Sequence, residues 1–137
     1  MRELHLQFLP ILVAAVVKMA LGALWYSNAL FFQPWIRMSG ISEQQVRQGL
    51  PKALVVDFIG SFLMALALVH VIRWGAAEPN NVIAGLFVAF LCWLGFVAVA
   101  TVSTVTYERK PLKLWSLNNG YQLVSMLIMG AILAVWG

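Results

Sequence analysis

Four long apolar stretches dominate the sequence and leave only short polar segments between them. They cover residues 8–30, 53–74, 82–106 and 112–136, and each reaches the roughly 20 residues that a membrane-spanning helix requires. Unpaired backbone amides are costly in hydrocarbon, so such stretches cross a bilayer as helices. We therefore predict an all-α integral membrane protein, a four-helix transmembrane bundle forming one domain over residues 1–137.

The composition agrees with a membrane protein and argues against a nucleic-acid-binding one. Only 10% of the residues are charged, whereas about 25% are charged in a soluble domain. The net charge of +4 comes from basic residues in the loops, without a basic patch interleaved with aromatic residues. The single cysteine offers no cysteine metal site, and two histidines form no cluster. We expect no nucleic acid, no metal ion and no cofactor.

The distribution of basic residues predicts the orientation of the chain. Six of them lie in or beside the two loops 31–52 and 107–111: Arg37, Arg47, Lys52, Arg109, Lys110 and Lys113. The opposite side has Arg2 and Arg73. By the positive-inside rule, both loops are predicted to be cytoplasmic and both termini to lie outside. Glu108, Arg109 and Lys110 are candidate functional residues of the cytoplasmic face.

A short interfacial helix is predicted at about 42–49 within the first loop. Ser42 and Gln45 have the spacing of a capping box, and Gly49 with Pro51 supplies a stop signal. The apolar residues between them recur at helical spacing, which is typical of a helix lying on the membrane surface.

Lys18 is the only charged residue of the first apolar stretch. A lysine near the middle of a bilayer costs about 2.5–3.5 kcal/mol, and ionisable residues at such depth usually mark functional sites. Gly22 and Trp25 follow on the same helical face, so this face is expected to contact protein. The alternative is a lysine that is uncharged, or hydrogen-bonded to amides and carbonyls, and only fixes helix packing.

The 1.5 Å rise per helical residue gives the depth of each polar residue, counted from the cytoplasmic end of its stretch. These residues divide into two predicted layers: Tyr26, Asp57 and Asn118 near the cytoplasmic end, and Lys18, Gln122 and Ser125 near the centre. An ion pair between Lys18 and Asp57 is the weaker interpretation, because a helical side chain leans towards its own N-terminus. The candidate ligand or ion-site residues are Lys18, Asp57, Tyr26, Trp25, Asn118 and Gln122.

Small residues predict where the helices approach one another closely. The candidate packing positions are Gly22, Gly60, Gly85, Gly95 and Ser125. A bundle this small encloses little space, and the small residues of the third stretch offer a surface for a second copy. We therefore expect a homo-oligomer in the bilayer, with a dimer favoured.

Several motifs are specific enough to suggest a family. The most specific are Gly-Ala-Leu-Trp-Tyr-Ser at 22–27 and Glu-Arg-Lys-Pro-Leu at 108–112, joined by Trp-Leu-Gly-Phe at 93–96 and Asn-x-Gly-Tyr at 118–121. In their order and spacing they resemble the DUF 1761 family (domain of unknown function 1761), small four-span membrane proteins of bacteria. The resemblance implies a protein of the bacterial cytoplasmic (inner) membrane. It implies no ligand or catalytic residues.

Three classes of function remain open. The first is an oligomeric transport or permeation protein, or a small-molecule-binding membrane protein, in which Lys18 and Asp57 bear the charges and an anion or amphipathic molecule binds. The second is a structural or accessory protein whose polar layers fix packing and whose basic loops bind anionic lipid. A membrane enzyme ranks last, and no catalytic residues are expected, because the sequence shows no Ser/His/Asp set, paired carboxylates or phosphate loop.

Overall fold

A computed structural model of the protein describes residues 2–27, 29–75 and 81–136, with side chains from Phe8 onward. The described chain is helical and contains no strand. Its elements are α1 (Arg2–Trp25), α2 (Phe32–Ser39), α3 (Glu43–Gly75), α4 (Val82–Cys92), the π-helical segment η1 (Trp93–Ala98), α5 (Val99–Thr101), α6 (Ser103–Thr106) and α7 (Leu112–Trp136). Elements α4 to α6 together form the third long helix. The predicted all-α fold is confirmed, since four of these helices are long and apolar enough to cross a membrane.

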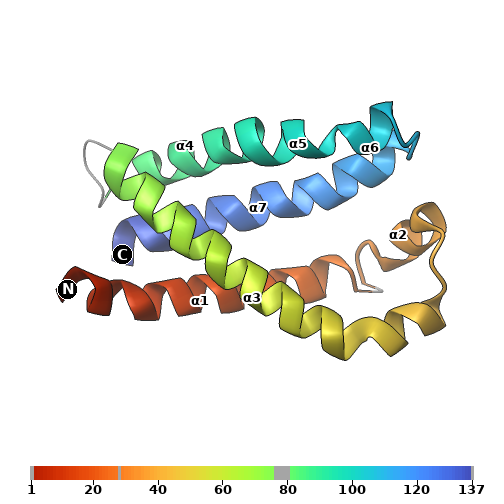
Figure 1. The fold of residues 1–137 in the computed structure, drawn as a ribbon, viewed down its shortest axis with the longest axis horizontal. Coiled ribbons are helices and arrows are strands. Elements are labelled where there is room, and N and C mark those ends of the chain that lie inside the picture. Colours follow the sequence, from red (N-terminus) through yellow and green to blue (C-terminus); the bar gives the residue numbers. More distant parts are fainter. Residues whose placement is uncertain (1, 28, 76–80, 137) are drawn as a thin grey trace.

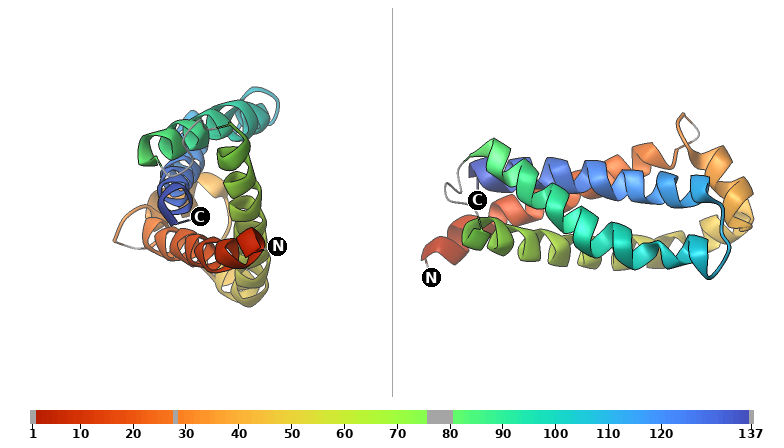
Figure 2. Two further views of the ribbon diagram at one scale, coloured as in Figure 1. Left: turned by 90° about the vertical axis from the view of Figure 1, so that its left-hand side faces the viewer. Right: turned by 90° about the horizontal axis from the view of Figure 1, so that it is seen from above.

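The four long helices form an elongated bundle (Figures 1 and 2). Both chain termini lie at one end, which we call the terminal end, while α2 and the 107–111 loop lie at the other, which we call the α2 end (Figure 1). Helix α7 is central because it packs against α1, α3 and α4. Both loops predicted to be cytoplasmic thus share one end, and the side of the membrane that this end faces stays a prediction.

Two predicted boundaries around the first loop are wrong. Helix α1 ends at Trp25 and not near residue 30, because the chain turns there and the Phe31 amide donates to the Trp25 carbonyl (3.1 Å). The short helix of this region is α2, which ends at Gly40 in the left-handed conformation (φ 75°). Helix α2 was not predicted, because residues 31–52 were assigned to a loop with one short helix at about 42–49.

The predicted interfacial helix at 42–49 is instead the beginning of α3. The capping box is present, since the Gln45 amide donates to Ser42 Oγ (3.1 Å) and the Ser42 amide to Gln45 Oε1 (3.0 Å). The helix then continues through Pro51 up to Gly75. A proline interrupts one backbone hydrogen bond, but residues 47–60 are all exposed in the single chain, so water can hydrate the freed carbonyl of Arg47.

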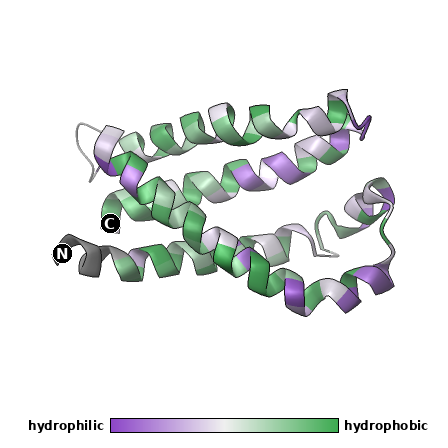
Figure 3. Ribbon diagram, viewed as in Figure 1, coloured by the Kyte–Doolittle hydropathy of each residue, from purple (hydrophilic) through white to green (hydrophobic). Residues whose placement is uncertain are grey.

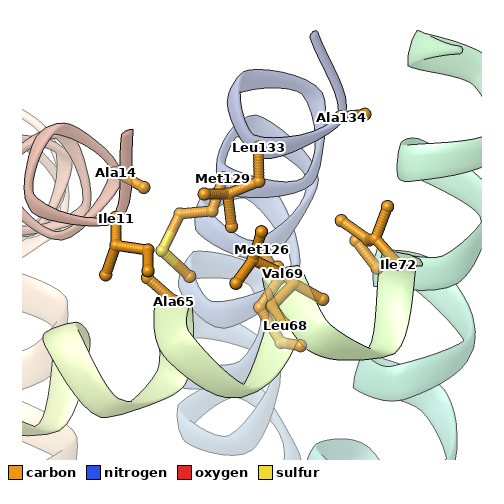
Figure 4. Close-up of a cluster of buried hydrophobic side chains, with 11 residues drawn as sticks. Ile11, Ala14, Ala65, Leu68, Val69, Ile72, Met126, Met129, Leu133 and Ala134 are labelled. Atoms are coloured by element: carbon orange, nitrogen blue, oxygen red, sulfur yellow. The ribbon is translucent and has the colours of Figure 1, made fainter. Parts of the chain in front are cut away.

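The apolar core is a cluster of buried side chains from α1, α3, α4 and α7 (Figure 4). Its buried side chains include Ile11 and Ala14 of α1, Ala65, Leu68, Val69 and Ile72 of α3, and Met126, Met129 and Leu133 of α7. Met129, which is fully buried, extends from α7 towards α1 (Figure 4). Apolar residues also cover the outside of the long helices, whereas hydrophilic residues gather at the α2 end and in the first half of α7 (Figure 3).

Glycines set the closest approach in the bundle, between α4 and α7. A Cβ atom at Gly85 would lie 2.5 Å from the Gly130 carbonyl oxygen, and one at Gly130 would lie 2.7 Å from the Gly85 carbonyl oxygen. Gly85 therefore lies at a helix crossing, as its small size suggested, and its partner Gly130 was not singled out in the sequence. The packing role predicted for Gly60 and Gly95 is not seen within the single chain, because a Cβ atom at either would meet no described atom within 4 Å.

Candidate functional site

Lys18 is buried, with only 3% of its surface exposed, and its amine points to α7. Lys18 Nζ donates to the Tyr121 hydroxyl (3.2 Å) and lies 4.8 Å from the centre of that ring. The Tyr121 hydroxyl in turn donates to the backbone carbonyl of Lys18 (3.0 Å). One tyrosine therefore binds both the amine and the backbone of Lys18, and so ties α1 to α7.

Asp57 of α3 provides the nearest negative charge. Its Oδ1 lies 3.9 Å from Lys18 Nζ, close enough for an ion pair and too long for a hydrogen bond. The two partners differ in exposure, because 46% of the Asp57 side chain is accessible and only 4% of the Lys18 side chain. The preference against a Lys18–Asp57 pair is therefore wrong. We call Lys18, Asp57 and Tyr121 the Lys18 cluster.

Gly22 makes room for this arrangement. It lies one helical turn after Lys18 on α1, directly beside the Tyr121 hydroxyl. A Cβ atom at this position would come within 2.8 Å of that oxygen, nearer than atoms in van der Waals contact allow. The absence of a side chain at residue 22 thus lets Tyr121 reach Lys18.

Tyr26 and Asn118 extend the contact between α1 and α7 towards the α2 end. The Tyr26 hydroxyl donates to Asn118 Oδ1 (2.7 Å), so these two residues of the predicted cytoplasmic layer do lie together. The Tyr26 ring packs edge-on against Tyr121, with 5.6 Å between centroids. Trp25 turns away from Lys18, and its indole N–H donates to the Leu117 carbonyl (3.1 Å).

The structure changes which residues surround Lys18 in the predicted central layer. Lys18 contacts Tyr121 and Asp57 in place of Gln122 and Ser125, and the Ser125 hydroxyl donates to the Gln122 carbonyl (3.0 Å). Two buried polar atoms, Gln122 Oε1 and Ser61 Oγ, have no hydrogen-bond partner among the described residues. Ser61 is 1% exposed and lies one helical turn from Asp57 on α3. Buried polar atoms are normally hydrogen-bonded, so these two stand out as exceptions.

Tyr121 is the member of the cluster that sequence reasoning missed. The residues of the fourth span that the sequence assigned to the two polar layers are Asn118, Gln122 and Ser125. Asn118, Tyr121 and Ser125 have the spacing i, i+3, i+7, which also describes one helical face. This face was the available signal, and it includes the residue that contacts Lys18.

A second polar network joins the third span to α7 around η1. The Asn119 carbonyl accepts from Trp93 Nε1 (2.9 Å), and Asn119 Nδ2 donates to the Trp115 carbonyl (3.0 Å). The Thr101 hydroxyl lies 2.9 Å from Asn119 Oδ1 and accepts from Trp115 Nε1 (3.1 Å). The wider turn of η1 lies between Trp93 and Thr101, the two residues of the third span that bind Asn119. Because its polar groups satisfy one another, this network fixes packing.

We expect Thr101→Val to destabilise the protein by about 1–2 kcal/mol, because the change leaves Asn119 Oδ1 and the Trp115 N–H without this partner in a partly buried site. Chemical unfolding in detergent, followed by circular dichroism, measures the loss. Thr104→Val is the matched control, since the Thr104 hydroxyl donates only along its own helix, to the Thr101 carbonyl (2.9 Å). Equal losses in both variants would contradict a stabilising role for the network.

The loop candidates Glu108, Arg109 and Lys110 lie exposed at the α2 end. Arg109 adopts a positive φ of 57°, and the Lys110 amide closes the turn by donating to the Thr104 carbonyl (2.8 Å). These residues belong to the surface of the bundle, apart from the buried Lys18 cluster.

The fold and the site together define a class: a membrane protein of four long apolar helices with a buried lysine held by a tyrosine and a carboxylate. The chain belongs to the family described as "Protein of unknown function (DUF1761)", whose model matches residues 9–134, nearly the whole chain. The family named from the motifs is thereby confirmed. No curated protein and no solved structure matches the chain.

Proposed function

We propose that the protein is a small oligomeric transport or permeation protein of the bacterial cytoplasmic membrane, and that the Lys18 cluster is its ligand or ion site. One observation carries this proposal. A buried lysine is held 3.9 Å from a carboxylate that is 46% accessible, so its charge is only loosely compensated. A pair that served packing alone would be expected to close to hydrogen-bond distance, because an uncompensated charge in a membrane is costly.

The cluster has binding capacity left over. A charged lysine offers three N–H donors, and the Tyr121 hydroxyl uses one of them. The Ser61 hydroxyl and Gln122 Oε1 add unpartnered polar atoms on α3 and α7. A small anion or the polar head of an amphipathic molecule fits the lysine N–H groups and the Ser61 hydroxyl, whereas Gln122 Oε1 can only accept a hydrogen bond. Asp57 offers a carboxylate that can accept a proton.

An oligomer accounts for the surroundings of Asp57. Residues 47–60 of α3 are exposed in the single chain, and the neighbours of Asp57 in this segment, Val55, Val56 and Phe58, are apolar. A carboxylate on a helix facing lipid on every side would be costly. A second copy packed along this part of α3 would cover it and leave a polar path beside Lys18.

Ion flux into proteoliposomes tests the proposal. The full chain is reconstituted in liposomes loaded with a pH-sensitive dye, with a potassium gradient and valinomycin as the driving force, and chloride influx is measured in parallel. We expect faster proton or chloride flux than in protein-free liposomes, reduced to that background by Lys18→Met and by Asp57→Asn. Lys52→Met and Glu43→Gln, at exposed positions of α3, are the controls and are expected to keep the flux.

Two results would count against permeation. One is flux of both ions at the protein-free rate in the wild type. The other is unchanged flux in the Lys18 and Asp57 variants.

The accessory role is the second candidate, and a specific observation favours it. Among the described residues, four hydrogen bonds join α1 and the residue that follows it to α7: from Lys18 Nζ to the Tyr121 hydroxyl, from Tyr121 to the Lys18 carbonyl, from Tyr26 to Asn118 and from Trp25 to the Leu117 carbonyl. Interhelical hydrogen bonds in membranes contribute about 0.6 kcal/mol on average, so these residues also stabilise packing. The two roles make opposite predictions for the stability of Lys18→Met.

A further inference from the structure

A groove opens at the α2 end between the end of α1 and the first turns of α7. Its volume is about 490 Å³, within the range of about 300–1,000 Å³ found for small-molecule sites. Its walls are apolar apart from one amine and one hydroxyl: Trp25, Phe31, Leu112, Leu117, Lys113 and Ser116. The groove is separate from the Lys18 cluster, because Lys18, Asp57 and Tyr121 are not among the residues that line it.

The aromatic wall of the groove is fixed in place. The Trp25 indole donates to the Leu117 carbonyl (3.1 Å), and its ring lies 4.9 Å from that of Phe31. Gly120 leaves space for the indole, since a Cβ atom there would lie 3.5 Å from the Trp25 ring. The apolar cavity is therefore preformed, which lowers the cost of binding a flexible chain.

Positive charge lies at one rim of the groove. Lys113 lines it, and Arg109 and Lys110 are exposed in the loop immediately before α7, where Glu108 is the one acidic residue. Tryptophan and basic residues together at the end of an apolar helix are typical of the headgroup level of a membrane. The groove thus combines an apolar channel with a cationic rim at the depth where phospholipid phosphates lie.

We propose that this groove binds an anionic glycerophospholipid, with one acyl chain along Trp25, Phe31 and Leu117 and the phosphate at Lys113. The charge complementarity selects the lipid: a headgroup with a net negative charge matches Lys113, Arg109 and Lys110, whereas a zwitterionic headgroup presents its own cation to them. The Ser116 hydroxyl offers a donor to the glycerol ester oxygens.

Native mass spectrometry of the full chain tests the lipid site. The purified protein is offered equimolar phosphatidylglycerol and phosphatidylcholine with identical acyl chains. We expect phosphatidylglycerol to be retained roughly fivefold more, the factor for about one basic residue at a membrane surface. Lys113→Met should reduce this preference severalfold, with Arg109 and Lys110 left to supply the remainder, whereas Lys52→Met, at an exposed position of α3, should keep it.

A groove-filling variant separates this site from general attraction to basic loops. Ser116→Phe, made at an exposed position of α7, should reduce the retention of both lipids while the charge of the protein is unchanged. An unchanged preference in Lys113→Met, or unchanged retention in Ser116→Phe, would overturn the proposal. The last experiment adds inorganic phosphate to the protein with bound phosphatidylglycerol. Displacement of the lipid by millimolar phosphate would show that the free anion is the ligand, and would overturn the proposal.

Discussion

Replacing Gly130 by valine is expected to destabilise the bundle by about 3 kcal/mol, the upper part of the range for overpacked interiors. The first added carbon would lie 2.7 Å from the Gly85 carbonyl oxygen and 2.8 Å from Ala89 Cβ. Backbone atoms at a helix crossing cannot rotate away, so α4 and α7 have to separate. Gly85→Val should act in the same way, since its Cβ would lie 2.5 Å from the Gly130 carbonyl oxygen. Unfolding in detergent, followed by circular dichroism, measures both losses.

Gly60→Val and Gly95→Val are the matched controls. A Cβ atom at either position would meet no described atom within 4 Å, so their stability should stay within about 0.5 kcal/mol of the wild type. A loss at Gly60 as large as that at Gly130 would contradict the packing described for α4 and α7. A lower oligomeric state of Gly60→Val with unchanged stability would instead locate a contact between copies on α3.

The four spans were predictable because the membrane leaves the chain little choice. Residues 82–106 and 112–136 were predicted with the bounds that the helices have, since the sequence is polar just before residue 82 and between residues 106 and 112. The predicted bounds were wrong where a helix does not begin or end together with its apolar stretch. The apolar stretch beginning at residue 8 continues to residue 30 although the helix ends at Trp25, and α3 begins ten residues before its apolar part.

The depths assigned to Lys18 and Asp57 from the sequence were both wrong. Lys18 was placed twelve residues before the end of its span, but it lies seven residues before Trp25, the last residue of α1. Asp57 was placed one turn inside its span, but it lies fourteen residues, or about 21 Å, beyond Glu43, the first residue of α3. Counted from these helix ends, Lys18 lies about 11 Å deep and Asp57 about 21 Å, the reverse of the predicted order. Depth counted along each helix alone therefore does not determine which polar residues meet.

Side-chain partners were harder to predict than helices. Tyr26 and Asn118 were assigned to one layer and do form a hydrogen bond, although Tyr26 lies just after the end of α1. Tyr121 and Gly130 were missed because a tyrosine and a glycine in an apolar helix carry no charge to mark them. Which side chains of α7 face α1 and α4 depends on the rotation of α7 about its axis. That rotation depends on its packing against α1, α3 and α4 together.

The stability of variants in the Lys18 cluster distinguishes a functional site from residues that only fix helix packing. Asp57→Asn leaves a buried ammonium without its nearest counter-charge, and we expect a loss of about 1–3 kcal/mol, less than for a fully buried pair because 46% of the Asp57 side chain is accessible. Lys18→Met keeps the length of the side chain and removes the buried charge. Tyr121 still donates to the backbone carbonyl of residue 18, so this variant should be as stable as the wild type or more stable.

The double variant completes the test. If the Asp57→Asn loss reflects the uncompensated charge of Lys18, then adding Lys18→Met should restore the stability of the single Lys18→Met variant. Thermal unfolding in detergent and the oligomeric state by size-exclusion chromatography with light scattering measure all three variants, with Lys52→Met as an exposed control. A Lys18→Met variant that loses stability and assembly would identify the lysine as a packing residue and favour the accessory role. If Lys18→Met instead keeps its stability and loses ion flux, the protein retains the buried charge of Lys18 because its function requires one.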